Sequence, residues 1–339
     1  MIPQDKSAAV TRGLREAFGV SECEDMRMMT KGHTTAIVLR IVVRGKAYLL
    51  RIIMRPNAKI GPARHFNCMK AAADAGIAPH VWCTSVEDEI SITDFVEEVP
   101  FPRTEALVLM PAALRTLHAL EPFCRVEDAY NTTCTFLLHK GTAVEDFIGK
   151  FQAAKVLSKE ETEKLLGWRA QVVEAYPHDE ENMVSSHNDL FKPDNTLFDG
   201  RRVWLVDWEA AFLNDRYVDL AVVSNLIVTN EAEGEIYLQK YFGQPADEYQ
   251  QARFFVMQQI VHMFYAMVYL YFASFGGPVD WNEEAPEFYE FHRRMCGGEV
   301  NLADQRAKVD FGKVHWNKLS ENMRGSRFDD ALRVVSGRH

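Results

Sequence analysis

Residues 185–195 have the sequence SSHNDLFKPDN, and residues 202–209 have the sequence RVWLVDWE. The first stretch is rich in small and polar residues and has no apolar period, which is typical of a loop. After Arg202 the second has four apolar residues at 203–206, as a short buried strand does, and it ends abruptly in Asp207 and Glu209. Gly200 indicates a turn between the two stretches. We therefore expect a polar loop beside a strand that ends in acidic residues.

A loop that carries Asp189 and Asn195, next to a strand that ends in Asp207, offers the groups that phosphoryl transfer needs. That reaction uses a carboxylate to orient or deprotonate the attacking hydroxyl group. It also uses oxygen ligands for the Mg²⁺ that neutralises phosphate charge. Each residue alone is more often a cap or a turn residue. Their order and spacing, taken together, predict a catalytic site.

The HNDL motif at residues 187–190, followed by Asn195 and the VDWE motif at 206–209, resembles the catalytic signature of the choline and ethanolamine kinases. These enzymes are a branch of the aminoglycoside phosphotransferase family, which shares the two-lobed fold of protein kinases. In the wider family the second motif residue is often Gly, whereas the choline kinase branch has Asn, as at Asn188. The resemblance implies an α+β fold with a small antiparallel sheet plus a helix, then a larger helical lobe.

One spacing departs from the family. The family usually has five steps from the catalytic Asp to the metal-binding Asn, and here Asp189 and Asn195 are six apart. Either the loop bulges by one residue or Asp194 takes the ligand position. We favour Asn195, because the apolar Leu197 and Phe198 follow it as the family's short strand would.

The resemblance implies a role for each residue of this site. Asp189 would accept the hydroxyl proton or orient the nucleophile, and it would be ionised at neutral pH because an ordinary Asp has a pKa of about 3.9. Asn195 and Asp207 would bind Mg²⁺, and Glu209 could reach the metal through water. Arg51, inside the apolar strand predicted at residues 47–54, would neutralise the phosphates of ATP, because a buried Arg is costly unless it is paired.

Further nucleotide contacts are expected in the first hundred residues. An ordinary hairpin loop explains the turn after residue 29 equally well, but its backbone amides and hydroxyl groups could hold phosphate oxygens. The candidate residues of this turn are Lys31, Gly32, Thr34 and Thr35. The family's inter-lobe hinge, which would contact adenine, falls at Asp94 and Val96. We therefore expect a nucleotide-binding lobe at residues 1–96 and a catalytic and acceptor-binding lobe at 97–339.

The helix predicted at residues 64–75 lacks a feature of kinases. Kinases place a Glu there to pair with the strand cation, and this chain has no Glu between Arg51 and Glu87. The partner of Arg51 could be His65, Asn67 or Asp74, or a residue elsewhere in the chain.

Aromatic residues near the helix predicted at 248–274 suggest an acceptor pocket. In the choline kinase branch this helix carries two tryptophans three residues apart, and Tyr265 and Val268 occupy the matching positions, with Tyr269 adjacent. Trp281 lies beyond it among acidic residues. Aromatic faces bind ammonium groups by cation–π attraction. An aromatic stripe at helical spacing is nevertheless more often core than binding site.

Composition limits the function classes. The chain has 339 residues and a net charge of −10. This charge argues against binding to nucleic acid or to an anionic membrane, since both reward basic patches. The six cysteines form no C-x-x-C pair, and the N-terminus lacks the apolar core of a signal peptide. We therefore expect free thiols and a cytoplasmic protein without membrane insertion. The oligomeric state is not predicted.

The sequence predicts an ATP- and Mg²⁺-dependent kinase that phosphorylates a small-molecule alcohol, with a choline- or ethanolamine-like amino alcohol as the leading acceptor class. One alternative is an antibiotic- or sugar-directed kinase of the same fold, which a broad acidic cleft without an aromatic box would favour. Another is a nucleotide-binding pseudokinase scaffold, which the missing helix Glu and the lengthened loop would favour.

Overall fold

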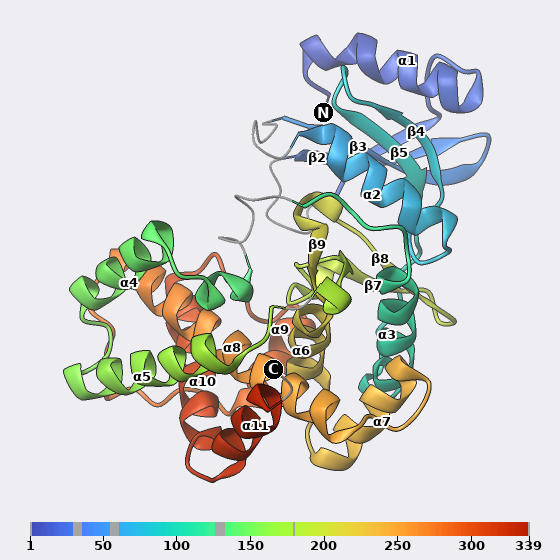
Figure 1. The fold of residues 1–339 in the computed structure, drawn as a ribbon. Helices are drawn as coiled ribbons and strands as arrows, with labels where there is room; N and C mark the ends of the chain where they lie inside the picture. The colour runs from blue at the N-terminus through green and yellow to red at the C-terminus, as the bar shows by residue number, and fades with distance from the viewer. Residues whose placement is uncertain (1, 30–35, 55–60, 126–132, 179, 338–339) are drawn as a thin grey trace. The chain divides into compact units, whose positions relative to one another are not determined.

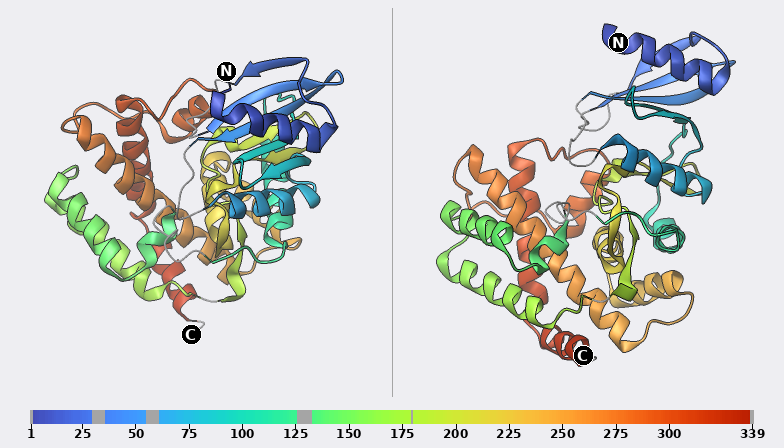
Figure 2. Two further views of the ribbon diagram at one scale, coloured as in Figure 1. Left: turned by 90° about the horizontal axis from the view of Figure 1, so that it is seen from above. Right: turned by 45° about the horizontal axis from the view of Figure 1, so that its top comes forward.

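The structure is a computed structural model, and it describes residues 2–29, 36–54, 61–125, 133–178 and 180–337. The chain divides into two compact units, drawn in Figures 1 and 2. Unit 1 comprises Met1–Arg125 and Ser185–Leu213, and unit 2 comprises Val126–Val184 and Asn214–His339. The predicted lobe boundary between residues 96 and 97 stays a prediction.

Unit 1 is built on a five-stranded antiparallel sheet with the strand order β1-β2-β3-β5-β4. A hairpin joins β2 and β3, and Arg44 and Gly45 at its tip both have positive φ angles. The strand predicted at residues 47–54 is therefore confirmed. The strands are β1 (Asp25–Met28), β2 (Ala36–Val43), β3 (Lys46–Ile53), β4 (Val81–Ser85) and β5 (Ile90–Asp94).

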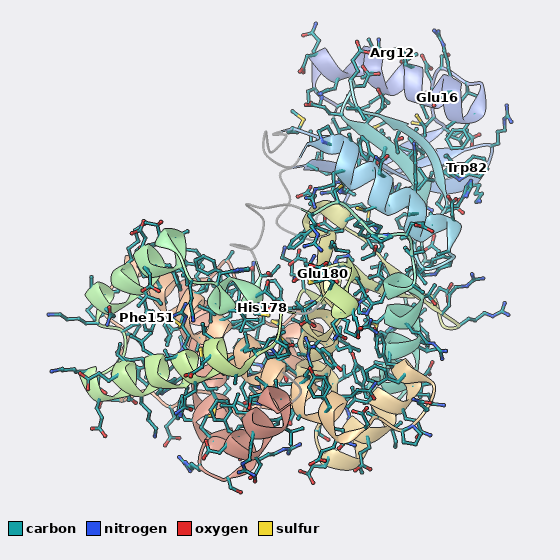
Figure 3. All side chains as sticks on the ribbon, viewed as in Figure 1. Arg12, Glu16, Trp82, Phe151, His178 and Glu180 are labelled. Carbon is teal, nitrogen blue, oxygen red and sulfur yellow. The ribbon has the colours of Figure 1, made fainter. Side chains whose placement is uncertain are left out.

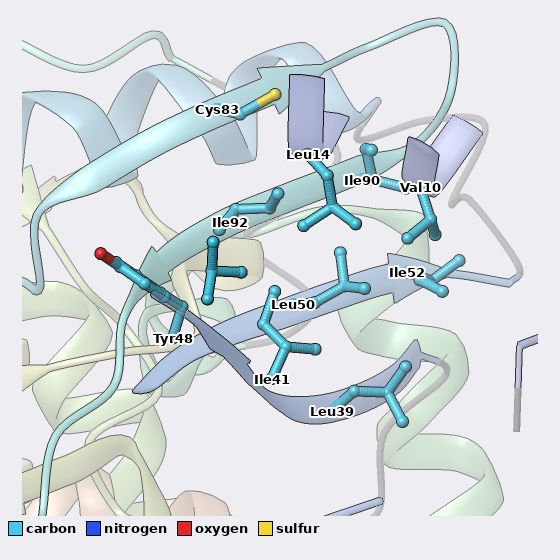
Figure 4. Packing of buried hydrophobic residues seen from close by; sticks show 11 residues of the cluster. Val10, Leu14, Leu39, Ile41, Tyr48, Leu50, Ile52, Cys83, Ile90 and Ile92 are labelled. Carbon is cyan, nitrogen blue, oxygen red and sulfur yellow. The ribbon is translucent and has the colours of Figure 1, made fainter. Parts of the chain in front are cut away.

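One face of this sheet is covered by α1 (Ser7–Phe18). Figure 4 shows Val10 and Leu14 of this helix over Leu50 and its neighbours on the sheet. Gly13 lets the helix approach closely, because a Cβ there would lie 2.7 Å from Ile90 Cδ1. Since strand side chains alternate between faces, Arg51 points away from this apolar layer.

The other helices of unit 1 frame the segments that carry the motifs. Helix α2 (Pro62–Asp74) packs against the short turn η6 (Trp208–Ala210), and α3 (Arg103–His118) packs against β8 (Val203–Leu205). Strand β8 pairs with β7 (Thr196–Phe198), while β6 (Met183–Ser186) and β9 (Phe212–Asp215) form a second two-stranded sheet.

A surface ion pair links α1 to the turn between β4 and β5. Arg12 on α1, labelled in Figure 3, donates from Nε to Asp88 Oδ2 at 3.1 Å. Asp88 belongs to the turn between β4 and β5. This contact joins the helix to that turn, although an exposed pair adds little stability.

Unit 2 is helical in its described part. Ser158 begins α5 with a capping box, since its hydroxyl oxygen accepts from the backbone N–H of Glu161. The helices are α4 (Thr142–Ala154), α5 (Lys159–Ala175), α6 (Arg216–Ile227), α7 (Glu231–Phe242), α8 (Glu248–Ala273), α9 (Phe288–Cys296), α10 (Gln305–Asn322) and α11 (Arg327–Ser336). The chain therefore has the predicted α+β class, with an antiparallel sheet followed by a mainly helical part.

Helix α8 is the centre of unit 2. Helices α6, α10 and α11 all pack on it. Its apolar stretch is long enough to cross a membrane by length and composition, yet 78% of that window is buried inside the protein. The helix predicted at residues 248–274 is confirmed, and it is a buried core helix. All six cysteines, which lie in the described part of the chain, are free thiols.

Candidate functional site

The two motif segments meet in unit 1 through backbone pairing. Strands β7 and β8 run antiparallel with Thr196 opposite Leu205. Just before and after this pair, the N–H of Val206 donates to the carbonyl oxygen of Asn195 at 3.0 Å. The end of the polar loop is therefore fixed directly beside the residue that precedes Asp207.

Asp189 is held by two nitrogen donors from its own loop. Lys192 Nζ lies 2.6 Å and Asn195 Nδ2 lies 3.1 Å from the same oxygen, Asp189 Oδ2. Asn195 is 4% exposed, and its amide nitrogen also donates to the Asp189 carbonyl oxygen at 2.7 Å. Asp194 is exposed. The loop contains a 3₁₀ turn at Pro193–Asn195, and Asn195 rather than Asp194 faces Asp189.

Asn188 explains why this position of the motif takes Gly or Asn. Its φ angle is 67°, in the left-handed region that Gly and Asn tolerate best. Its side-chain nitrogen donates to the carbonyl oxygens of Ala210 at 3.1 Å and Phe212 at 3.3 Å. Asn therefore supplies hydrogen bonds, which Gly would lack, between the loop and the segment after Asp207.

Asp207 has a strained backbone and a cationic partner. Its φ angle is 66°, which costs energy in a non-glycine residue and is most often kept at functional sites. Arg51 Nη1 donates to Asp207 Oδ1 at 2.9 Å, and Arg51 Nη2 contacts Glu209 Oε1. Thus the partner of Arg51 is the acidic pair of the second motif. His65, Asn67 and Asp74 do not fill that role.

Helix α2 contributes a cation instead of the expected carboxylate. Arg64 donates to the backbone carbonyl oxygen of Glu209 at 2.5 Å and contacts that of Ala211. His65 beside it is buried, while Asn67 and Asp74 are exposed. Helix α2 therefore binds the backbone of residues 209–211 through Arg64. The side chains of Asp207 and Glu209 bind Arg51 on β3.

The two Asp carboxyl groups of the site have pKa values shifted in opposite directions. Burial raises the pKa of Asp189 above its usual range, although the nearby Lys192 ammonium opposes this. Burial would also raise the pKa of Asp207, but Arg51 and Lys192 outweigh it, so the pKa of Asp207 lies below its usual range. Burial and the charge of Arg51 lower the pKa of His65 to about 3, so this ring is neutral at pH 7. Asp189 is thus the more basic of the two carboxylates.

The oxygen ligands of the site fit a magnesium ion whose remaining ligands come from phosphate and water. No three Asp, Glu, His or Cys side chains converge on a metal position within the described ranges. Mg²⁺ is usually bound through one or two carboxylates, with substrate phosphates and water filling the octahedron. Asp207 and Glu209 supply two carboxylates, and Asn195 faces Asp189 with its amide nitrogen. An amide oxygen and two carboxylates are ligands that Mg²⁺ accepts.

Other nucleotide-contact predictions remain predictions. Lys31, Gly32, Thr34 and Thr35 lie outside the described residues. The Asp94 carboxylate accepts from Lys46 Nζ at 2.9 Å and from Trp82 Nε1 at 3.0 Å, which fixes the end of β5.

A backbone hydrogen bond fixes the start of the predicted hinge. The N–H of Asp94 donates to the carbonyl oxygen of His80 at 2.9 Å. Val96 is half-buried.

The aromatic acceptor candidates lie in unit 2, whereas Asp189 lies in unit 1. Tyr265 is 8% exposed, and its ring lies 5.4 Å from that of Phe311. Tyr269 is half-buried, with its ring 4.4 Å from Phe311 and 6.3 Å from Tyr265. The two tyrosines therefore form one aromatic cluster, of which Tyr269 is the more accessible.

Trp281 lines a cavity of about 330 Å³ together with Glu283, Glu284, Ala285 and two residues of α10, Lys313 and Asn317. Its indole nitrogen donates to the carbonyl oxygen of Val156 at 2.7 Å. The ammonium of Lys313 lies 5.2 Å from the Trp281 ring centre and donates to the Glu283 carbonyl oxygen at 2.9 Å. A cation of the protein itself is therefore already bound at this ring.

Two site residues were missed by sequence reasoning. Arg64 lies among buried positions of α2, and a buried cation in a helix is a signal that it has a partner. Lys192 stands three residues after Asp189, but side-chain contact at that spacing depends on the loop conformation.

Solved structures of similar fold are phosphotransferases. A choline/ethanolamine kinase family protein from Mesorhizobium loti is 19% identical, with a TM-score of 0.61 over 98% of this chain and 99% of that chain. A choline kinase from Cryptosporidium parvum Iowa II is 13% identical, with a TM-score of 0.59 over 98% and 99%. A spectinomycin phosphotransferase, solved with ADP and spectinomycin, is 10% identical, with a TM-score of 0.56 over 97% of both chains.

These likenesses define a protein-kinase-like fold. The fold and the carboxylate site define the molecule as a phosphotransferase with an alcohol group as acceptor. The family model described as the phosphotransferase enzyme family (APH) matches residues 30–255, and the chain belongs to this family. No curated protein matches the sequence.

Proposed function

We propose that this enzyme transfers the γ-phosphoryl group of ATP to the hydroxyl group of a choline- or ethanolamine-like amino alcohol, with Mg²⁺ as cofactor. The arrangement that carries the proposal is Asp189, held by Asn195, next to the strand that ends in Asp207. An acceptor-activating carboxylate and a metal-binding carboxylate are the two parts that phosphoryl transfer requires.

Asp189 would accept a hydrogen bond from the acceptor hydroxyl group and take its proton as the new O–P bond forms. Burial favours this role because it raises the pKa of Asp189, which makes the carboxylate a better proton acceptor. Asn195, Asp207 and Glu209 would hold Mg²⁺, which when bound supplies positive charge to the phosphates. Arg51 would turn from its carboxylate partners to the nucleotide phosphates.

The proposal that ATP is the donor also includes the residues expected to contact it. Asp94 and Val96 would flank the adenine. Lys31, Gly32, Thr34 and Thr35 would contact the phosphates. The spectinomycin phosphotransferase of similar fold was solved with ADP, which supports an adenine nucleotide here.

The amino-alcohol acceptor is supported by the HNDL motif and by two structural relatives described as choline or choline/ethanolamine kinases. Tyr265, Tyr269 and Trp281 are the proposed contacts for its ammonium group, since aromatic faces attract cations. We also propose a small-molecule acceptor only, without nucleic acid, and a cytoplasmic location in which the free thiols stay reduced.

An ADP-release screen tests the proposal. The purified chain with Mg²⁺ and ATP would be given choline, ethanolamine, aminoglycosides and sugars in parallel. The proposal expects release that depends on choline or ethanolamine and that disappears without Mg²⁺. Faster turnover with an aminoglycoside or a sugar would transfer the assignment to that acceptor. ATP binding without release for any acceptor would favour a pseudokinase scaffold.

A further inference from the structure

Arg64 is a buried cation that donates its hydrogen bonds to backbone oxygen atoms. The residue is 9% exposed, and its guanidinium donates to the carbonyl oxygen of Glu209 at 2.5 Å and contacts that of Ala211. Among the residues that the structure describes, no carboxylate forms an ion pair with it. A buried charge is costly without a counter-charge, and a neutral donor would satisfy a carbonyl oxygen at lower cost. The position therefore has a use for a guanidinium beyond filling space in α2.

Helix α2 holds the turn after Asp207 at two positions. Cys68 follows Arg64 by four residues, so both side chains lie on the same face of the helix. The Cys68 Sγ atom lies 3.9 Å from the carbonyl oxygen of Ala211, which Arg64 also contacts. Ala211 is 0% exposed. Because a buried carbonyl oxygen needs a partner, this end of the turn depends on α2.

Asp207 stands between two fixed points of the backbone. Its φ and ψ angles are both 66°, a left-handed conformation that persists only where the surroundings hold it. On one side, the N–H of Val206 donates to the carbonyl oxygen of Asn195 at 3.0 Å. On the other side, Arg64 holds the carbonyl oxygen of Glu209. These two attachments set the directions in which the carboxylates of Asp207 and Glu209 leave the chain.

Two arginines divide the support of this segment. Arg51 binds the side chains of Asp207 and Glu209, whereas Arg64 binds the backbone. In the proposed reaction Arg51 would turn to the nucleotide phosphates, and the metal would take its place at the carboxylates. The contacts of Arg64 do not compete with the metal for any oxygen atom. They would therefore persist when the support from Arg51 is lost.

We propose that Arg64 is a positioning residue for the magnesium ligands. By holding the carbonyl oxygens of Glu209 and Ala211, it keeps Asp207 in the left-handed conformation and directs both carboxylates toward Mg²⁺ once Arg51 has left them. This inference rests on the proposed function and deepens it. Arg64 itself touches neither the metal nor the nucleotide, and its guanidinium keeps its protons throughout.

A purely structural role would leave a different trace. An arginine that only supports the fold would, when replaced, lower the melting temperature and weaken nucleotide binding equally with and without metal. An arginine that positions the metal ligands would, when replaced, weaken the metal much more than the metal-free nucleotide.

The test measures two affinities by calorimetry in wild type, Arg64→Met and Arg64→Lys. The first is that of ADP in the presence of a chelator, and the second is that of Mn²⁺ for the protein saturated with ADP. We expect Arg64→Met to lose on the order of 10–100-fold in Mn²⁺ affinity, as for a lost hydrogen bond from a charged group, while metal-free ADP binds within about threefold of wild type. Arg64→Lys keeps the charge but not the fork of donors, so it should lose less.

Arg169→Met is the matched control, because the Arg169 guanidinium also donates to two backbone carbonyl oxygens, those of Leu137 at 3.0 Å and His139 at 2.8 Å, within unit 2. It should change neither affinity. If Arg64→Met does not fold, the same comparison in Arg64→Lys decides. Unchanged Mn²⁺ affinity, or an equal loss of both affinities, would overturn the positioning role. Failure of wild type to bind ADP would overturn the proposed function itself, which is a distinct result.

Discussion

Arg51 Nη1 lies 2.9 Å from Asp207 Oδ1, although 156 residues separate the two in the sequence. The cation that the family resemblance assigns to the phosphates is therefore paired with a carboxylate proposed for the metal. The same guanidinium contacts Glu209. The site thus neutralises its own acidic pair, and a metal ion has to compete with Arg51 for both side chains.

Arg51→Gln should separate these two functions of the guanidinium. The amide keeps a polar group on β3 but removes the positive charge from the two carboxylates. We expect Mn²⁺, used as a probe without nucleotide, to bind about tenfold more tightly, which corresponds to about 1.4 kcal/mol. ATP should bind more weakly. Both affinities can be measured by calorimetry.

Arg27→Gln controls for the loss of a surface cation from the same sheet, because Arg27 pairs only locally, with Asp25 at 2.9 Å among the described residues. It should change neither affinity. Weaker Mn²⁺ binding in Arg51→Gln would show that Arg51 supports the metal site and does not compete with the ion.

Asp207→Ala should abolish turnover, because the alanine removes the charged oxygen ligand. Alanine also tolerates the left-handed backbone at this position less well than Asp does. The affinity for Mg²⁺·ATP should fall far more than the affinity for ATP measured with a chelator. Asp207→Asn, which keeps the shape and the tolerance for positive φ, serves as the second variant. An equal loss with and without metal would assign Asp207 a structural role.

Tyr269→Ala should raise the acceptor KM by roughly 30-fold, since a desolvated cation–π contact contributes about 2 kcal/mol. Tyr269→Phe keeps the ring and should do much less, and the KM for ATP should stay unchanged in both. Tyr265→Ala removes a nearly buried ring and should also cost stability, about 3–5 kcal/mol by analogy with other large aromatic truncations.

Tyr271→Ala is the control on the same helix, because Tyr271 is half-buried and packs on Phe147 outside the proposed contacts. An unchanged acceptor KM in a folded Tyr269→Ala protein would remove Tyr269 from the acceptor site.

Three buried histidines predict an acid-sensitive unit 2. His262 Nδ1 and His315 Nδ1 lie 2.9 Å apart, and the His292 ring lies 5.3 Å from that of His315. Burial lowers the pKa of His262 to about 3 and of His292 to about 4, and lowers the pKa of His315 well below its usual range. Each gains a proton on unfolding below pH 6.5. Stability is therefore fully present above about pH 6.5 and falls as the pH decreases toward 4.

Each such histidine should contribute a slope of about 1.4 kcal/mol per pH unit to the free energy of unfolding in this range. Urea unfolding between pH 7 and pH 5 measures it. His262→Asn should reduce the slope by about one proton. An unchanged slope in His262→Asn would show that this ring is protonated in the folded protein.

Much of the fold follows from local patterns. Alternating apolar residues and a Gly-containing turn predict β2 and β3, and the capping box at Ser158 predicts the start of α5. The acidic partner of Arg51 could not be predicted in the same way. It depends on tertiary pairing between β3 and a segment more than 150 residues later, where no local pattern operates.

The loop after Asp189 also has features that the sequence predicts and a contact that it does not. Its residue types predict a catalytic segment, and the short apolar run after Asn195 predicts β7. The contact between Lys192 and Asp189 depends on a 3₁₀ turn that the sequence pattern does not distinguish from other turns. Similarly, apolar spacing predicts α8, but the exposure of Tyr269 compared with Tyr265 depends on how α10 packs against it.

The most direct measurement is the identification of the phosphorylated product by mass spectrometry after incubation with ATP, Mg²⁺ and choline or ethanolamine, for wild type and Asp189→Asn. We expect wild type to form the phosphate ester of the amino alcohol. Asp189→Asn should bind ATP nearly as well but lose turnover by about 10²–10⁴-fold, as for a lost general base. Wild type that forms no phosphate ester of either amino alcohol, or Asp189→Asn that retains wild-type turnover, would contradict the account.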